Sequence, residues 1–238
     1  MTVAAGAFSG DSGVNGKTAS LDFGGVRREL ARGNRVLLMV RHAERRKMDV
    51  DDPTFGETLP ITATGEETSR EFGRRLADCA EGVQFLASPL LRTRMTARRI
   101  AEGMGVDPAV VADADPLGNG TPVFADQRAV FEWFRDGRFF DHVFEYFATG
   151  RGPGLAELRT GARELERWAL SVFTGRLGVF ASHDFQIAAW LRGMDAVEVF
   201  TRETWLRFLD GGAIVLGADG SVRRALFRAG LSEGVCGV

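Results

Sequence analysis

Short apolar runs alternate along this chain with longer amphipathic stretches, and this alternation restricts the fold more than any other feature. The runs predict strands near residues 35–40, 83–87, 108–112, 177–182 and 212–217. Helical periodicity falls near residues 65–79, 90–104, 126–147, 155–173 and 184–192. Strands that alternate with helices form a mostly parallel sheet with helices on its faces. The sequence therefore predicts an α/β three-layer sandwich.

The chain has 238 residues, a length that suits one sizeable core. We expect a single domain over residues 1–238, whose Gly- and Ser-rich segment 1–20 is flexible. Residues 113–150 are a candidate for a small helical cap insertion, because the segment 124–147 is rich in aromatic residues. Phe140, Phe144 and Phe147 recur there at helical spacing, which is as typical of a core stripe as of a cap. Near the end, Ala218-Asp219-Gly220 predicts a turn between two antiparallel strands.

Composition excludes several classes of protein. With 45% hydrophobic and 26% charged residues the chain is an ordinary globular protein, and its net charge of −2 gives no reason to expect nucleic acid or a membrane surface as partner. The two cysteines, Cys79 and Cys236, form neither a disulfide framework nor a zinc motif, which predicts a cytoplasmic protein. No apolar run approaches the roughly 20 residues of a membrane span.

Candidate catalytic and anion-binding residues lie at the ends of two predicted strands and at the start of one predicted helix. Arg41 and His42 follow the apolar run Val36–Val40, and His183-Asp184 follow another apolar run. Arg92 lies in the first turn of a predicted helix, for which Ser88 is the expected N-cap and Pro89 the first residue. In open α/β sheets ligands bind beyond the carboxyl ends of strands. A guanidinium beside a helix N-terminus suits a phosphate group.

Each of these features also has a structural explanation. Strand ends are commonly polar, Asp184 is a good helix N-cap, and the Arg92 segment resembles a solvated helix face. His142, the third histidine, has no such context and is expected on a helix surface. Two histidines at equivalent positions coincide by chance less readily than one.

Taken together, five segments resemble the histidine phosphatase superfamily, which includes phosphoglycerate mutases and histidine acid phosphatases. They are "VRHAER", "LPITATGEETSREFGRRL", "ASPLLRTRMTARRIAEGMG", "ASHDFQIAAWL" and "LDGGAIVL", in the family's order from residue 36 to about 217. The resemblance implies that His42 is the phosphoryl-accepting nucleophile, that Arg41, Arg45, Arg92 and His183 bind the phosphoryl group, and that Asp184 is the proton donor. Ala43 replaces the usual Gly, and Lys47 replaces the proline of the acid-phosphatase motif.

This residue set suits the chemistry of a phosphate monoester. Neutral imidazole is a suitable attacker of a dianion, and arginines with a protonated His183 would neutralise the phosphoryl oxygens, so no metal or other cofactor is expected. Asp184 would protonate the leaving group and then activate water. Other acids stay open for this role, namely Glu44, Glu132, Asp136 and Glu145.

The expected activity is a metal-independent phosphatase that acts on a small phosphorylated substrate or a phosphoprotein through a phosphohistidine. A mutase is the close alternative. A phosphate-binding module without turnover and a metallohydrolase are further alternatives, although the chain contains no HExxH spacing. The sequence does not determine the substrate or the oligomeric state.

Overall fold

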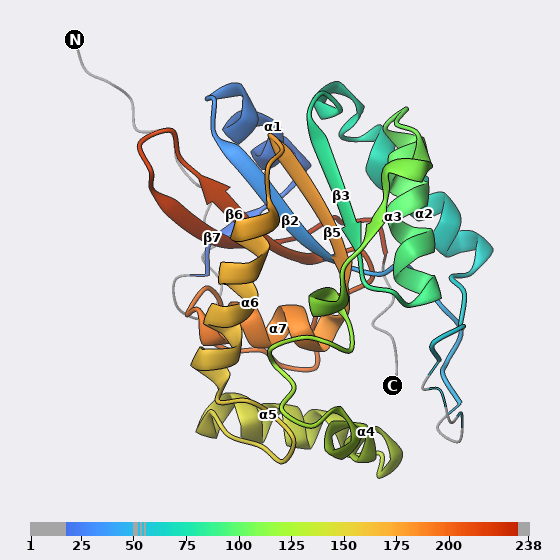
Figure 1. Cartoon of the computed structure of the whole chain (residues 1–238), viewed down its shortest axis with the longest axis vertical. Coiled ribbons are helices and arrows are strands. Elements are labelled where there is room, and N and C mark those ends of the chain that lie inside the picture. Colours follow the sequence, from blue (N-terminus) through green and yellow to red (C-terminus); the bar gives the residue numbers. More distant parts are fainter. Residues whose placement is uncertain (1–17, 50–51, 53, 55, 233–238) are drawn as a thin grey trace.

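The computed structural model describes residues 18–49, 52, 54 and 56–232. Its centre is one sheet of seven strands in the order β1-β7-β6-β2-β5-β3-β4 (Figure 1). The neighbours β2, β5, β3 and β4 run parallel, whereas β6 pairs antiparallel with both β2 and β7. The strands are β1 Ser20–Leu21, β2 Arg35–Arg41, β3 Val83–Ala87, β4 Ala112–Asp113, β5 Leu177–Ser182, β6 Gly211–Leu216 and β7 Val222–Phe227.

Helices cover both faces of this sheet. They are α1 Phe23–Ala31, α2 Ala63–Arg74, α3 Leu91–Gly103, α4 Gln127–Arg135, α5 Phe139–Thr149, α6 Leu158–Val172 and α7 Asp184–Gly193, with short 3-10 turns at Ala77–Cys79, Pro108–Val110 and Asp115–Leu117. None of the described helices is long and apolar enough to cross a membrane. The single sheet with helices on both faces confirms the predicted three-layer α/β sandwich.

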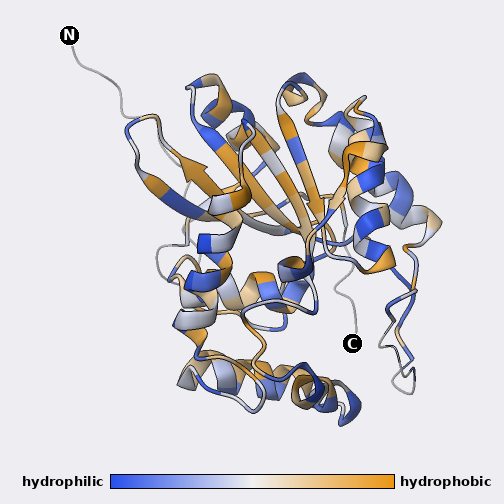
Figure 2. Ribbon diagram, viewed as in Figure 1, coloured by the Kyte–Doolittle hydropathy of each residue, from blue (hydrophilic) through white to orange (hydrophobic). Residues whose placement is uncertain are grey.

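The alternation of side chains along β2 explains the two layers. Leu37 and Met39 join the core beneath α5, α6 and α7, whereas Val36, Leu38 and Val40 join the core beneath α1, α2 and α3. Successive residues of a strand point to opposite faces, so a strand buried on both sides reads as an unbroken apolar run. Figure 2 shows this as apolar strands in the middle of the molecule.

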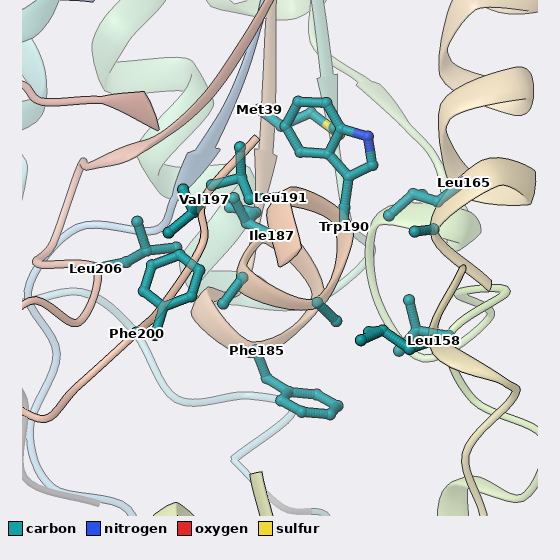
Figure 3. Packing of buried hydrophobic residues seen from close by; sticks show 14 of the residues in the cluster. Met39, Leu158, Leu165, Phe185, Ile187, Trp190, Leu191, Val197, Phe200 and Leu206 are labelled. Atoms are coloured by element: carbon teal, nitrogen blue, oxygen red, sulfur yellow. The ribbon is translucent and has the colours of Figure 1, made fainter. Parts of the chain in front are cut away.

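The α7 helix is almost wholly buried because it packs between the sheet and other helices. Trp190, Leu191 and Ile187 of α7 lie in one cluster with Met39 of β2 and Leu165 of α6 (Figure 3). The indole N–H of Trp190 donates a hydrogen bond of 3.0 Å to Glu166. This burial fixes the start of α7, where His183 and Asp184 lie.

Several elements differ from the sequence expectation. The run 108–112 is a 3-10 turn followed by a two-residue strand, because Pro108 opens the turn and Asp107 caps it. The stretch 126–147 is two helices, α4 and α5, separated at Gly137, whose φ of +71° only glycine adopts freely. The sequence reading missed β1 and α1.

The sequence expectations for the N-terminal segment, the final turn and the aromatic middle region have different outcomes. Residues 1–17 of the segment expected to be flexible lie outside the described residues, and Ser20 begins β1. The turn at 218–220 does join two antiparallel strands, as predicted. Phe140 and Phe147 of α5 are buried against Trp205, which places this stripe in the core. That residues 113–150 act as a cap stays a prediction.

Candidate active site

The register of the sheet brings distant segments to one edge. Arg41 at the end of β2 pairs with Ser182 at the end of β5, and the backbone N–H of His42 donates to the Ser182 carbonyl at 3.0 Å. On the other side of β5, the Ser88 N–H donates to the Ala181 carbonyl at 3.0 Å. Because these parallel strands end together, His42, Ser88 and His183 emerge side by side.

His42 is buried, with 3% of its surface exposed, and its ring centroid lies 5.5 Å from that of His183. Its Nδ1 lies 2.8 Å from the Ala43 carbonyl oxygen. A carbonyl only accepts, so Nδ1 carries the proton and Nε2 carries the lone pair. Burial first, and then the charges of Arg92, His183 and the neighbouring arginines, hold the pKa of His42 well below 6.5. The imidazole is therefore neutral at pH 7.

The loop after His42 is held from the opposite side by α3. The N–H of Ala43 donates to Thr96 Oγ1 at 2.9 Å, and this hydroxyl in turn donates to the Arg92 carbonyl at 2.7 Å. Ala43 and Thr96 are both fully buried. The nucleophile candidate and the first turn of α3 thus share one hydrogen-bond chain. The substitution of Ala43 for the family's usual glycine causes no backbone strain, because Ala43 is absent from the described non-glycine residues with positive φ.

His183 is held by a second chain of hydrogen bonds. Its Nδ1 lies 3.4 Å from an Arg92 nitrogen, which can only donate, and its Nε2 lies 3.0 Å from Ser88 Oγ. His183 Nε2–H therefore donates to Ser88, whose hydroxyl is 2.8 Å from Thr93 Oγ1. Burial and the nearby arginines lower the pKa of His183 well below 6.5. The expected protonated His183 is thus not the form that these surroundings favour.

Ser88 is not the helix N-cap that the sequence suggested. The cap of α3 is Leu90, which makes no side-chain capping bond, and the helix begins at Leu91. Likewise His183 is the N-cap residue of α7, and Asp184 is its first helical residue. The Ser88 hydroxyl is used to orient His183 instead. Hydroxyl and carboxylate side chains that serve a site and those that cap a helix have the same sequence signature.

Arg92 and Arg45 supply positive charge close to His42 and His183. Arg92 is 8% exposed, and one of its terminal nitrogens donates to the Gly56 carbonyl at 2.6 Å. Burial, Arg45 and Arg41 lower the pKa of Arg92 to about 9, while Asp184 opposes them. Within the described residues no hydrogen-bond acceptor meets Nε of Arg41, Arg45 or Arg92. Buried guanidinium groups with unused donors favour an anion at this place.

Arg41 is buried, with 2% of its surface exposed. One terminal nitrogen donates to the Leu206 carbonyl, the other forms an ion pair of 3.1 Å with Asp184 Oδ2, and the guanidinium stacks 4.5 Å from the Phe208 ring centroid. That Arg41 binds the phosphoryl group stays a prediction. The ion pair holds Arg41 against Asp184, and the positive charge of Arg41 contributes to the lowered pKa of His42.

Asp184 is held as a carboxylate by several donors. Besides Arg41, the indole Nε1–H of Trp205 donates to its Oδ2 at 3.0 Å, and the Phe185 N–H lies 3.0 Å from its Oδ1. Burial alone would raise its pKa, but Arg41, Trp205 and Arg45 lower it below its ordinary value. Asp184 is therefore ionised at neutral pH.

These groups surround a cavity of about 80 Å³. Its polar lining residues include His42, Arg45, Arg92, His183 and Asp184, and its apolar lining residues are Met48, Leu90, Phe124, Phe131 and Phe185. Asp184 is the one carboxylate among the residues that line this cavity in the described chain. In the same part of the chain no group of three or more His, Cys, Asp or Glu side chains could hold a metal ion.

The other candidate acids lie elsewhere. Glu44 accepts a bond of 2.8 Å from Thr62 Oγ1 near the start of α2, and Asp136 pairs with His142 at 2.7 Å on the surface. Glu132 and Glu145 are exposed on α4 and α5. The structure therefore brings together all six predicted site residues and leaves these four carboxyl groups outside the cavity.

Sequence reasoning missed four groups at this site. Ser88 was assigned to a helix cap, Thr96 and Trp205 were given no role, and Asn119 lies in a turn without any motif. Asn119 and Phe124 precede α4 and reach the cavity from the middle region. The local signals for two of these groups were the Ser88 hydroxyl directly after β3 and the aromatic residues before β6, which include Trp205.

Comparison with known proteins gives a family match over part of the chain and several structures of similar fold. Residues 37–116 match the model of the histidine phosphatase superfamily (branch 1). No curated protein sequence matches the chain. Among solved structures, mycobacterial hydrolase 1 is 15% identical with a TM-score of 0.51 over 82% of this chain and 98% of that one.

Two further structures share the fold. Native mycobacterial glucosyl-3-phosphoglycerate phosphatase is 16% identical with a TM-score of 0.51, over 81% of this chain and 97% of the other. Bacillus stearothermophilus YhfR is 13% identical, also with a TM-score of 0.51, over 83% of this chain and 99% of the other. At these identities the likeness is one of fold. The family match over residues 37–116 and the shared fold confirm the resemblance of this chain to the histidine phosphatase superfamily.

Proposed function

We propose that this protein is a phosphatase that hydrolyses small phosphate monoesters through a phosphohistidine at His42, without a metal ion. The observation that carries the proposal is the state of His42. Its Nδ1–H is bound to the Ala43 carbonyl, its pKa lies well below 6.5, and it lines a cavity that Arg45 and Arg92 also line. A neutral nucleophile surrounded by cations suits attack on an anionic phosphorus.

In the first step Nε2 of His42 forms a bond to phosphorus while the ester P–O bond breaks. Arg45 and Arg92 stabilise the negative charge on the phosphoryl oxygens as the bond lengthens. Entry of a phosphoryl anion beside His183 raises the pKa of that imidazole, because a nearby negative charge favours the charged form. His183 then becomes a positively charged donor beside the arginines, as the sequence predicts.

The leaving oxygen needs a proton, and Asp184 is the carboxyl group in place to deliver it. Because Arg41 and Trp205 keep Asp184 ionised, the proton must arrive with the substrate. A phosphate monoester has a second pKa of about 6, so its monoanion carries one. The monoanion passes its proton through Asp184 to the departing alkoxide, and Asp184 is then again a carboxylate.

In the second step Asp184 accepts a proton from water, which attacks phosphorus as the P–N bond to His42 breaks. Phosphate takes the proton back from Asp184 and leaves as its monoanion, so Asp184 is again a carboxylate and the imidazole regains its lone pair. A carboxylate that the protein holds ionised is suited to this base role. A mutase would return the phosphoryl group to substrate instead of to water. A phosphoprotein substrate would have to insert its phosphorylated side chain between the same aromatic walls.

The test is a screen of phosphomonoesters with wild type, His42→Ala and Asp184→Asn in the presence of EDTA. We expect turnover by wild type, none by His42→Ala, and slow accumulation of acid-labile phosphoenzyme in Asp184→Asn. His142→Ala is the matched control, because His142 pairs with Asp136 and does not line the phosphate cavity. Full activity of His42→Ala, or loss of wild-type activity in EDTA, would contradict the proposal. Binding of phosphate without any turnover would instead indicate a binding module.

A further inference from the structure

A second cavity adjoins the phosphate cavity and shares three of its lining residues. It has a volume of about 420 Å³, several times that of the first, and both cavities are lined by Thr54, Asn119 and Phe131. A group bonded to a phosphoryl oxygen at His42 has this larger space as its neighbour. The second cavity is therefore the place where the leaving group of a phosphate ester would lie.

One wall of the second cavity is a stripe along α4. Gln127, Arg128, Phe131, Glu132 and Arg135 recur on the same side of this helix and line the space. The helix is fixed at its start, because the Asp126 carboxylate caps it and the backbone N–H groups of residues 125 and 126 donate to the Gly154 carbonyl. The stripe is thus presented by a capped helix rather than by an unsupported loop.

The opposite wall is tied directly to the phosphate-binding arginine. Glu57 lines the second cavity, and its carbonyl accepts a hydrogen bond of 3.1 Å from the Leu91 N–H at the start of α3. The preceding carbonyl, of Gly56, accepts the bond of 2.6 Å from Arg92. The backbone of Glu57 is therefore held next to the guanidinium of Arg92, so this wall of the second cavity adjoins the proposed phosphate-binding group.

The chemistry of these walls indicates the class of leaving group. Ligand pockets are usually lined mostly by apolar side chains, but seven of the eight residues that line this cavity are polar. Its two acidic residues, Glu57 and Glu132, balance its two arginines, Arg128 and Arg135. A balanced site gives no net attraction to a second phosphate or carboxylate. It offers hydrogen-bond donors and acceptors in similar number.

Hydroxyl groups are the ligand groups that both donate and accept, so they suit carboxylates, guanidinium groups and the amides of Asn119 and Gln127 together. Phe131 adds one flat apolar face, against which the C–H face of a sugar ring can pack. We propose that the second cavity binds a neutral polyhydroxylated leaving group, so that the substrates are sugar or polyol phosphates. This inference rests on the proposed phosphatase function.

The test compares esters that share a phosphoryl group and differ in the leaving group. The probes are hexose 6-phosphates and glycerol 3-phosphate as polyol esters, phenyl phosphate as an apolar ester, and 3-phosphoglycerate as an ester with a second anion. We expect kcat/KM for the best hexose phosphate to exceed that for phenyl phosphate at least tenfold, although phenol is the better leaving group. We expect no preference for 3-phosphoglycerate.

Variants connect this preference to the cavity. Glu57→Ala and Gln127→Ala each remove a polar wall group, and we expect the ratio of kcat/KM for hexose phosphate to that for phenyl phosphate to fall at least fivefold, mainly through KM. Glu145→Ala is the matched control, because Glu145 is exposed on α5 and lines neither cavity. It should keep the wild-type ratio. Thermal melts establish that each variant is folded.

The outcomes separate this inference from the proposed function. Hydrolysis of phenyl phosphate with no preference for polyol esters, or an unchanged ratio in both cavity variants, overturns the assignment of the second cavity and leaves the phosphatase intact. A clear preference for 3-phosphoglycerate overturns the neutral class. Absence of hydrolysis for every ester overturns the proposed function and this inference with it.

Discussion

The indole Nε1 of Trp205 donates a hydrogen bond of 3.0 Å to Oδ2 of Asp184, the same oxygen that forms the 3.1 Å ion pair with Arg41. Trp205 is 1% exposed and lies among the aromatic side chains of α5. The α5 helix is thereby connected to the acid–base candidate of the site, although α5 contributes no residue to the phosphate cavity.

Replacing Trp205 with Phe should change the pH dependence of turnover. The variant loses one donor to the ionised carboxylate, so the pKa of Asp184 rises, and the corresponding limb of the kcat profile moves to higher pH by about 0.5–1 unit. The control is Trp190→Phe, which removes an equally buried indole donor from Glu166, outside the site. Equal shifts in both variants would show that Trp205 only supports the core.

Stability should fall as pH decreases below 6.5. In the folded protein the pKa values of His42 and His183 lie well below 6.5, so between those values and 6.5 the unfolded chain binds protons that the folded chain does not. Each histidine should remove about 1.4 kcal/mol of unfolding free energy per pH unit within that window. Urea unfolding at pH 7.0, 6.0 and 5.5 measures this slope, which should be shallower in His42→Asn. A flat profile would mean that both imidazoles protonate freely when folded.

Arg92→Lys should weaken the binding of a phosphate analogue. Lysine keeps one positive charge but loses the planar fork, which both donates to the Gly56 carbonyl and faces His183. We expect the inhibition constant for vanadate to rise at least tenfold. Arg94→Lys is the matched control two residues along, where an exposed arginine pairs with Asp113, and it should change the constant less than twofold. Similar effects in both would contradict the assignment of Arg92.

Two glycine-to-alanine changes in helices should have opposite effects. At Gly103 in α3 a Cβ atom would overlap the Arg70 carbonyl of α2, so Gly103→Ala should destabilise the protein by about 1–3 kcal/mol or more. At Gly24 in α1 the nearest atom outside its chain neighbours is the flexible end of Arg28 at 3.3 Å, and the change should stabilise by up to about 1 kcal/mol. Denaturant unfolding measures both. A stabilising Gly103→Ala would mean that α2 and α3 do not cross so closely.

Local sequence patterns predicted the central strands of the sheet and the helices that cover it. The apolar runs at 35–40 and 177–182 are strands because both faces of these strands are buried, and the turn at Asp219-Gly220 joins an antiparallel pair. Patterns failed where one residue overrides periodicity, as at Gly137, or where an element is short and amphipathic, as with β1 and α1. Propensity is a weak signal there, and tertiary contacts decide.

For the candidate site, the sequence identified the residues, and the tertiary structure determined their protonation and orientation. The sequence by itself determined which side chains stand at strand ends, because a buried strand must surface where its apolar run stops, and it thereby selected Arg41, His42, His183 and Asp184. A predicted helix start selected Arg92, and the family resemblance added Arg45. Only the tertiary structure decided their states. The Trp205 indole that binds Asp184 lies 21 residues away along the chain, and the Leu206 carbonyl that binds Arg41 lies 165 residues away. The 5.5 Å between the two imidazole centroids likewise depends on how the strands pair. Protonation and orientation respond to charges and donors in space, and sequence order does not specify those distances.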